Sequence, residues 1–213
     1  MVVITLSSFK IKGGILPHIP DETTELYIDY NDLTSLPPLP PCLEILDCSR
    51  NNLTSLPPLP LTLRVLKCGY NNLTSLPLLH EGLIELQYNN NNITILPLLP
   101  NSLLILNCGR NNITMLPFLL PPNLKTLYAY NNDIRWIPLL PESLTFKALG
   151  GNDNLPTLYT MYCLSIARKD QREEWNTAAS RIQRAWTRYW YYPNKEGISR
   201  YSSYMSRLDL HVE

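Results

Sequence analysis

Side chains that could carry out acid–base, thiol or metal chemistry are few and scattered along this chain. Its histidines, His18, His80 and His211, belong to three distant regions, and the chain has no glycine-rich phosphate loop or nucleophile elbow. The 5 cysteines are an odd number without a Cys-x-x-Cys pair, which favours buried thiols of a reducing compartment over a disulfide framework. We therefore predict a protein that is not an enzyme and that holds no metal or cofactor.

The elements that position the other polar side chains come from an internal repeat. Asparagines recur at a spacing of 20 residues, and once at 21, at Asn31, Asn51, Asn71, Asn91, Asn111, Asn132 and Asn152. Each unit continues as Asn-Asn-Leu/Ile-Thr-x-Leu-Pro and ends in Leu-x-x-Leu-x-Cys or a close variant. Self-similarity at this period predicts a solenoid in which every unit forms one coil.

Each coil is predicted to contribute one short parallel strand. Within 43–48, Leu46 and Cys48 alternate with Ile45 and Asp47, so we expect the first pair to point inward and the second pair outward. The inward position of Cys48 is filled in the other coils by Ile28, Cys68, Tyr88, Cys108 and Ala129. Three of the five cysteines are therefore expected to be small buried hydrophobic residues.

The repeated asparagines, which we call the asparagine ladder, are expected inside the turn that follows each strand. There a side-chain amide can pair with backbone groups of adjacent coils that would otherwise be buried without partners. The prolines predict the other side of the coil: 18 of the 19 precede residue 157, in runs such as 36–41. Proline excludes an α-helix, so we expect extended polyproline return arms and a sheet on the concave face.

The motif resembles a leucine-rich repeat of the short, proline-bearing type found in bacterial effector proteins. Together with the C-terminal segment, the chain is similar to leucine-rich repeat proteins of giant DNA viruses that infect amoebae. The resemblance implies an α/β repeat solenoid that serves as a binding scaffold, and it implies no substrate. The expected organisation is an N-terminal cap at 1–12, about seven repeats at 13–156, a helical cap and basic aromatic helix at 157–192, and a tail at 193–213.

Outward-facing strand residues are expected to form columns that bind a protein partner. Tyrosine and arginine are enriched at interaction hot spots, whereas three cations are too few for a groove that tracks phosphates. The balance of 18 basic and 18 acidic side chains also argues against a general nucleic-acid binder. The predicted partner-binding residues are Tyr27, Tyr30, Arg50, Lys67, Tyr70, Arg110, Tyr128 and Tyr130.

The segment 176–192 is predicted to be a basic amphipathic helix. It resembles an IQ motif, which implies binding of calmodulin or a related protein, although Thr187 stands where the motif has a basic residue. A second interpretation is that its aromatic face packs on the last coil or on another subunit. The residues of this IQ-like helix are Ile182, Gln183, Trp186, Arg188, Tyr189 and Trp190.

The predicted function is that of a non-enzymatic adaptor whose strand-bearing face binds a protein, from a host cell if the viral resemblance holds. One alternative is a self-associating virion or scaffold component that uses the aromatic helix, and a second is calmodulin-type binding. No apolar run approaches the roughly 18 to 20 residues that cross a bilayer. We therefore expect a cytoplasmic protein, in the host cytosol if it is viral.

Overall fold

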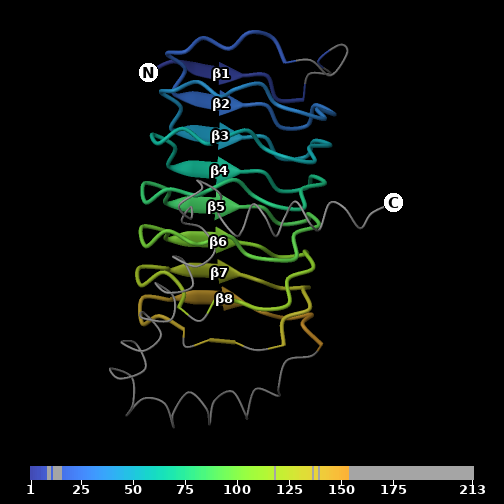
Figure 1. Ribbon diagram of the computed structural model, residues 1–213, viewed down its shortest axis with the longest axis vertical. Helices are drawn as coiled ribbons and strands as arrows, with labels where there is room; N and C mark the ends of the chain where they lie inside the picture. Colours follow the sequence, from blue (N-terminus) through green and yellow to red (C-terminus); the bar gives the residue numbers. More distant parts are fainter. Residues whose placement is uncertain (9–10, 12–15, 118, 136, 139, 154–213) are drawn as a thin grey trace, which may run out of the picture. The chain divides into compact units, whose positions relative to one another are not determined.

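The computed structural model describes residues 1–8, 11, 16–117, 119–135, 137–138 and 140–153, all within one unit, Met1–Thr157. Eight strands of three residues form one sheet in sequence order (Figure 1). Every strand pairs parallel with the next, without a register shift. The strands are β1 Val3–Thr5, β2 Glu25–Tyr27, β3 Ile45–Asp47, β4 Val65–Lys67, β5 Glu85–Gln87, β6 Ile105–Asn107, β7 Thr126–Tyr128 and β8 Phe146–Ala148.

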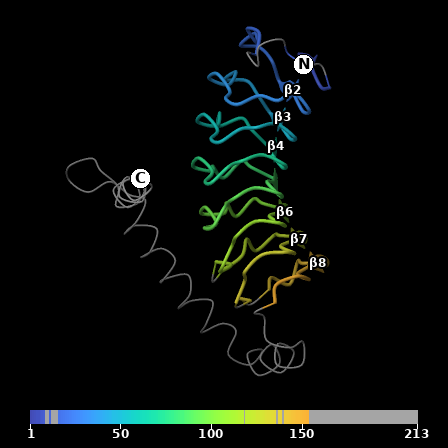
Figure 2. The ribbon, with the colours of Figure 1, turned by 90° about the vertical axis from the view of Figure 1, so that its right-hand side faces the viewer.

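The strands lie along one side of the stack of coils, and the return arms lie along the other (Figure 2). In β2 to β7 the central residue is buried and its two neighbours are half-buried, as the alternation of side chains along a strand requires. Paired strands in register place these central leucines in one row: Leu26, Leu46, Leu66, Leu86, Leu106 and Leu127. The parallel solenoid predicted from the repeat is confirmed.

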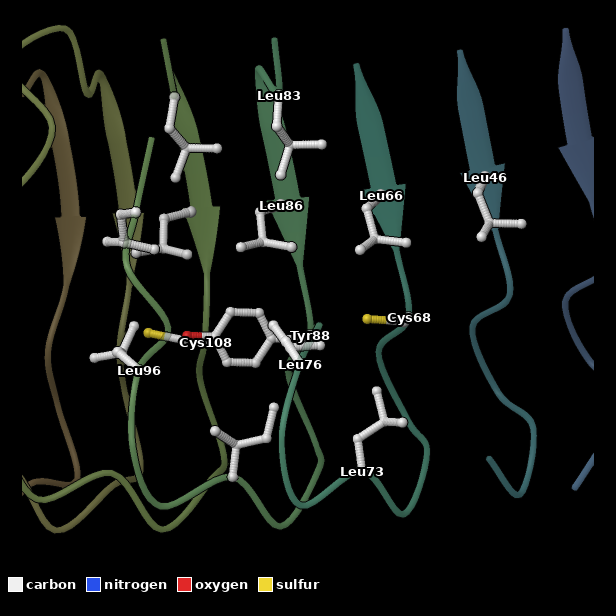
Figure 3. Close-up of a cluster of buried hydrophobic side chains, with 14 of the residues drawn as sticks. Leu46, Leu66, Cys68, Leu73, Leu76, Leu83, Leu86, Tyr88, Leu96 and Cys108 are labelled. Atoms are coloured by element: carbon white, nitrogen blue, oxygen red, sulfur yellow. The ribbon is translucent and has the colours of Figure 1, made fainter. Parts of the chain in front are cut away.

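The second inward position also forms a buried row. Ile28, Cys48, Cys68, Tyr88, Cys108 and Ala129 are all fully buried, which confirms the predicted environment of the three cysteines. Tyr88 is the largest side chain of the row, and its hydroxyl points toward Cys108 (Figure 3). The Cys108 thiol itself donates to the carbonyl of Tyr128, 3.3 Å away.

Every member of the asparagine ladder is buried, with 1% to 7% of its surface exposed. In Asn51 the amide nitrogen donates to the carbonyls of Ile28 (2.9 Å) and Cys48 (3.0 Å), which belong to adjacent coils. The amide oxygen accepts from the backbone N–H of Leu33 (2.9 Å) in the preceding coil. One side chain therefore satisfies backbone groups on both sides of a coil boundary that no regular secondary structure would pair.

The return arms contain no helix among the described residues. Proline removes the backbone donor that an α-helix needs, and the arms are correspondingly short and irregular. Partly buried leucines such as Leu36, Leu56 and Leu79 still pack against the core from this side. The structure therefore describes an all-β solenoid, and the helical part of the predicted α/β class falls on residues 157–192, outside the described residues.

The two ends of the sheet differ from its middle. β1 lies within the residues expected to be an N-terminal cap, and it pairs with β2 as a full member of the sheet. At the other end, Lys147 of β8 occupies the register position of the core leucines, opposite Leu127, and it is exposed. A lysine at an inward position of an end strand opposes the addition of another strand or chain.

The tail at 193–213 and the IQ-like helix, from Ile182 to Trp190, also lie outside the described residues. Calmodulin binding and self-association through that helix stay predictions. In the described part of the chain there is no helix long and apolar enough to cross a membrane.

Candidate protein-binding face

The outward side chains of β2 to β8 form what we call the strand face. Because the strands share one register, equivalent outward residues of neighbouring strands lie side by side, about 4.8 Å apart. The central column holds the predicted residues Tyr27, Lys67 and Tyr128, and all three are half-buried. The face is therefore a regular surface of short columns rather than an enclosed cleft.

Beside the strand face runs the rim, three residues beyond the end of each strand. The rim comprises Tyr30, Arg50, Tyr70, Asn90, Arg110, Asn131 and Gly151, and every one of them has a positive φ, between 50° and 71°. The left-handed conformation is held because rim N–H groups donate to the next coil, as from Arg50 to the carbonyl of Gly69 at 2.8 Å. Left-handed backbone is rare for tyrosine and arginine and common for asparagine and glycine. Asn90, Asn131 and Gly151 at the same position of the repeat therefore indicate, in the sequence, that the rim is left-handed.

Three predicted residues meet at this rim. The guanidinium of Arg50 lies 4.7 Å from the centroid of the Tyr30 ring and 4.2 Å from that of the Tyr70 ring. Both distances are within the range of cation–π attraction, so the arginine is sandwiched between the two rings. We call this cluster the Arg50 stack; Tyr30 is 53% exposed and Tyr70 is 43% exposed, so solvent reaches it from outside.

Lys67 forms an ion pair with a neighbour on the strand face. Its ammonium lies 3.7 Å from a carboxylate oxygen of Glu85, one strand along. The amide of Gln87 donates to the same oxygen of Glu85 at 2.6 Å. Lys67 therefore contributes less free positive charge to a partner than its sequence position suggested.

The first coils of the strand face are acidic. The hydroxyl of Tyr27 donates to Glu25 at 2.9 Å, and this hydrogen bond is the main reason that the pKa of Tyr27 is raised. Burial, the charge of Glu25 and the charge of Asp47 raise that pKa further. Asp47 also accepts a hydrogen bond from the N–H of Ser49 at 3.0 Å. A group of the partner that binds over Tyr27 therefore contacts a neutral phenol and lies near the carboxylates of Glu25 and Asp47.

The last coils carry an aromatic cluster that the residue types alone did not reveal. The rings of Tyr128 and Phe146 are 5.0 Å apart at an interplanar angle of 47°, and Phe146 is 48% exposed. Tyr130 lies over Gly109, where an added Cβ would come within 2.5 Å of its ring. In the sequence, the place of Phe146 in the same outward column as Thr126 indicates that its ring lies on the strand face.

The structure thus groups the predicted partner-binding residues into two clusters. The Arg50 stack, Tyr27 and Lys67 belong to β2 through the turn after β4, whereas Tyr128 and Tyr130 lie at β7. The Asn- and Gln-bearing coils of β5 and β6 lie between the two clusters. Arg110, exposed on the rim, lies nearer to the second cluster. A partner that touches both clusters must span about 14 Å, from β4 to β7.

Similarity to known proteins is found in the structure of the solenoid rather than in family or curated sequences. No protein-family model matches the chain, and no curated protein matches it. The LRR domain of a Shigella effector has a similar structure, at 28% identity and a TM-score of 0.68, over 79% of this chain and 77% of that one. YopM, a leucine-rich effector protein from Yersinia pestis, is similar at 35% identity and a TM-score of 0.68, over 75% of this chain and 46% of that one.

The described solenoid shares its fold with these leucine-rich repeat structures. The leucine-rich repeat domain of APL1B is also similar, at 25% identity and a TM-score of 0.56, over 69% of this chain and 49% of that one. The chain thus spans about half the length of the YopM and APL1B structures. Leucine-rich repeat neighbours of this kind suggest a scaffold for protein interactions.

The buried cysteines of the described solenoid lie in an apolar environment. Burial raises the pKa of the Cys48 and Cys68 thiols, and it raises that of Cys108 to about 12. Such thiols stay protonated at neutral pH and are poor nucleophiles. Within the described residues, no group of three or more His, Cys, Asp or Glu side chains could hold a metal ion.

Proposed function

We propose that this chain is a non-enzymatic adaptor that binds a protein partner through the strand face and its rim. The observation that supports this most is the Arg50 stack, an exposed arginine ordered between two exposed tyrosines. Tyrosine and arginine are the side chains that contribute most often to binding hot spots, and ordering them in advance lowers the entropic cost of association. The unbroken strand register supports a continuous surface of several coils.

The charges favour a protein over a nucleic acid. A groove that follows a phosphate backbone needs several unpaired cations, but Lys67 is paired with Glu85 on this face. The carboxylates of Glu25 and Asp47 would repel phosphates at the first coils. Tyrosines, half-buried apolar residues and a few charges match the mixed composition of protein interfaces.

Photo-crosslinking tests this proposal. Benzoylphenylalanine replaces Tyr128 on the strand face in one variant and Leu78 in another, since Leu78 is 74% exposed on a return arm. After irradiation in lysate of the source or host cell, we expect a discrete protein adduct from the Tyr128 position alone. Adducts from the Leu78 position alone, or from neither, would contradict the proposal.

Charge reversal provides a second measurement with the captured partner. In R50E/K67E the cation between the two tyrosines is lost and the new carboxylate at position 67 faces Glu85, so we expect capture to be lost. A variant with R135E, whose arginine is exposed beyond the turn after β7, is the matched control and should capture normally.

The cellular location is part of the proposal. The buried, protonated thiols of Cys48, Cys68 and Cys108 are consistent with a reducing compartment. The similarity to bacterial effectors supports a host cytosol as the place of action, and a viral origin stays a prediction. Fractionation of expressing cells, with the partner followed in parallel, tests the location.

A further inference from the structure

We propose that the Arg50 stack is a binding site for a single carboxylate group of the protein partner. This inference rests on the proposed function and adds the chemical group that the partner must present. It starts from the geometry of the arginine, whose guanidinium lies 4.2 Å and 4.7 Å from two ring centroids. Rings above and below leave the edge of the guanidinium, with its N–H donors, as the side available to a ligand.

The arginine is held in place but its charge is not neutralised. Arg50 is exposed and makes no ion pair with any described residue, although acidic residues are frequent in the neighbouring coils. Its backbone, with a φ of 55° and the hydrogen bond to Gly69, directs the side chain along the rim toward the tyrosines. Guanidinium and carboxylate match as two parallel hydrogen bonds, and the ordered arginine loses little further entropy when they form.

The surroundings favour one carboxylate over a phosphate or a polyanion. Asp29 directly precedes Tyr30, and Asp47 lies three residues before Arg50, so their carboxylates repel a doubly charged group about twice as strongly as a single carboxylate. Lys67 is paired with Glu85, and the next cation along the rim, Arg110, is three coils away, about 14 Å. A lone acidic side chain, or the carboxyl terminus of the partner, fits this single unpaired cation.

The test begins with a library of random 12-residue peptides, displayed on phage through their N-termini so that their C-termini are free, and selected on the full chain. Selected peptides are synthesised with acetylated N-termini, and each is made with a free and with an amidated C-terminus. We expect every binder that R50Q weakens to contain Asp or Glu or to need its free C-terminus. Amidation therefore distinguishes a terminal carboxylate from a side-chain carboxylate.

Binding is measured by calorimetry for the wild type, R50Q and the matched control R135Q, which removes the same charge. We expect R50Q to raise the dissociation constant at least about tenfold, as loss of a charge-assisted bidentate contact does. R135Q should leave it unchanged. Exchange of the peptide's essential Glu for Gln should weaken binding to the wild type by a similar factor and have no further effect on R50Q.

A second variant distinguishes loss of the binding site from misfolding of the protein. Y70L removes one ring of the stack and retains the arginine, and we expect an intermediate loss of affinity, with far-UV circular dichroism unchanged. If carboxylate-bearing peptides bind R50Q and Y70L as tightly as the wild type, the inferred site is wrong and the adaptor proposal stands. If no peptide is selected and no crosslink forms at Tyr128, the adaptor proposal itself is wrong. Stronger binding of inorganic phosphate or phosphopeptides than of carboxylates would also overturn the inference.

Discussion

The side-chain amide of Asn71 donates a hydrogen bond to the carbonyl of Cys48, 23 residues earlier in the chain, across 3.0 Å. The same nitrogen lies 3.1 Å from the carbonyl of Cys68 in its own coil, and the amide oxygen accepts from Leu53 N–H at 2.9 Å. One side chain thereby joins two coils by hydrogen bonds that neither strand pairing nor the core provides.

We expect N71A to lower the free energy of unfolding by about 3 kcal/mol, because it leaves several buried backbone groups without partners. Urea denaturation at pH 7 measures this. The matched control is N72A at the adjacent asparagine, which is exposed and makes no side-chain hydrogen bond with the described residues. Its effect should stay within about 0.5 kcal/mol; equal effects of the two variants would show that the ladder is not what joins the coils.

Alkaline pH should destabilise the solenoid through its buried thiols. Their folded-state pKa values are raised above the ordinary value of 9.0, to about 12 for Cys108, so the folded state retains protons that the unfolded state releases. Stability is therefore fully present below pH 9.0 and is lost as the pH rises toward the folded-state pKa.

The measurement is guanidinium denaturation under reducing conditions between pH 7 and about 11. Each thiol that stays protonated in the folded state should lower the free energy of unfolding by about 1.4 kcal/mol for every pH unit above the pKa of that thiol in the unfolded chain. C108A should show a shallower decline than the wild type at high pH and a parallel curve at neutral pH. C42A is the control, because Cys42 is exposed, and its curve should follow the wild type throughout.

Gly109 and Gly150 occupy the same outward position in different coils, and they should respond differently to substitution by alanine. A Cβ at Gly109 would lie 2.5 Å from the ring of Tyr130, whereas a Cβ at Gly150 would meet nothing within 4 Å. We expect G109A to turn the Tyr130 ring aside and to cost about 1 kcal/mol, and G150A to be nearly neutral. Ring-proton chemical shifts of Tyr130 report the displacement, and unchanged shifts in G109A would count against the contact.

Tyr27 should titrate at lower pH when Glu25 is replaced. The hydrogen bond to Glu25 and the charge of that carboxylate both raise the pKa of the phenol, so E25Q should lower it. The measurement is the Cζ chemical shift of ¹³C-labelled tyrosine, assigned with Y27F. E44Q, at an exposed carboxylate that does not act on Tyr27, should leave the titration in place. A pKa that E25Q does not move would contradict the contact.

The architecture of the coils followed from the sequence because a closed coil that repeats every 20 residues places each copy in the same environment. The identity of the buried rows, including residues as different as Cys48, Tyr88 and Ala129, needed only the strand alternation and the repeat. The prolines excluded helical return arms by their missing N–H. For the same reasons the sequence also predicts the columns of the strand face.

Contacts within those columns were decided only by the tertiary structure. A long exposed side chain has several neighbours within reach, and its backbone conformation and rotamer decide which one it meets. The left-handed rim thus stacks Arg50 on Tyr30 and Tyr70, while Lys67 turns to Glu85. Periodicity determined which residues share the face, and packing between coils determined which charges there are left free to bind.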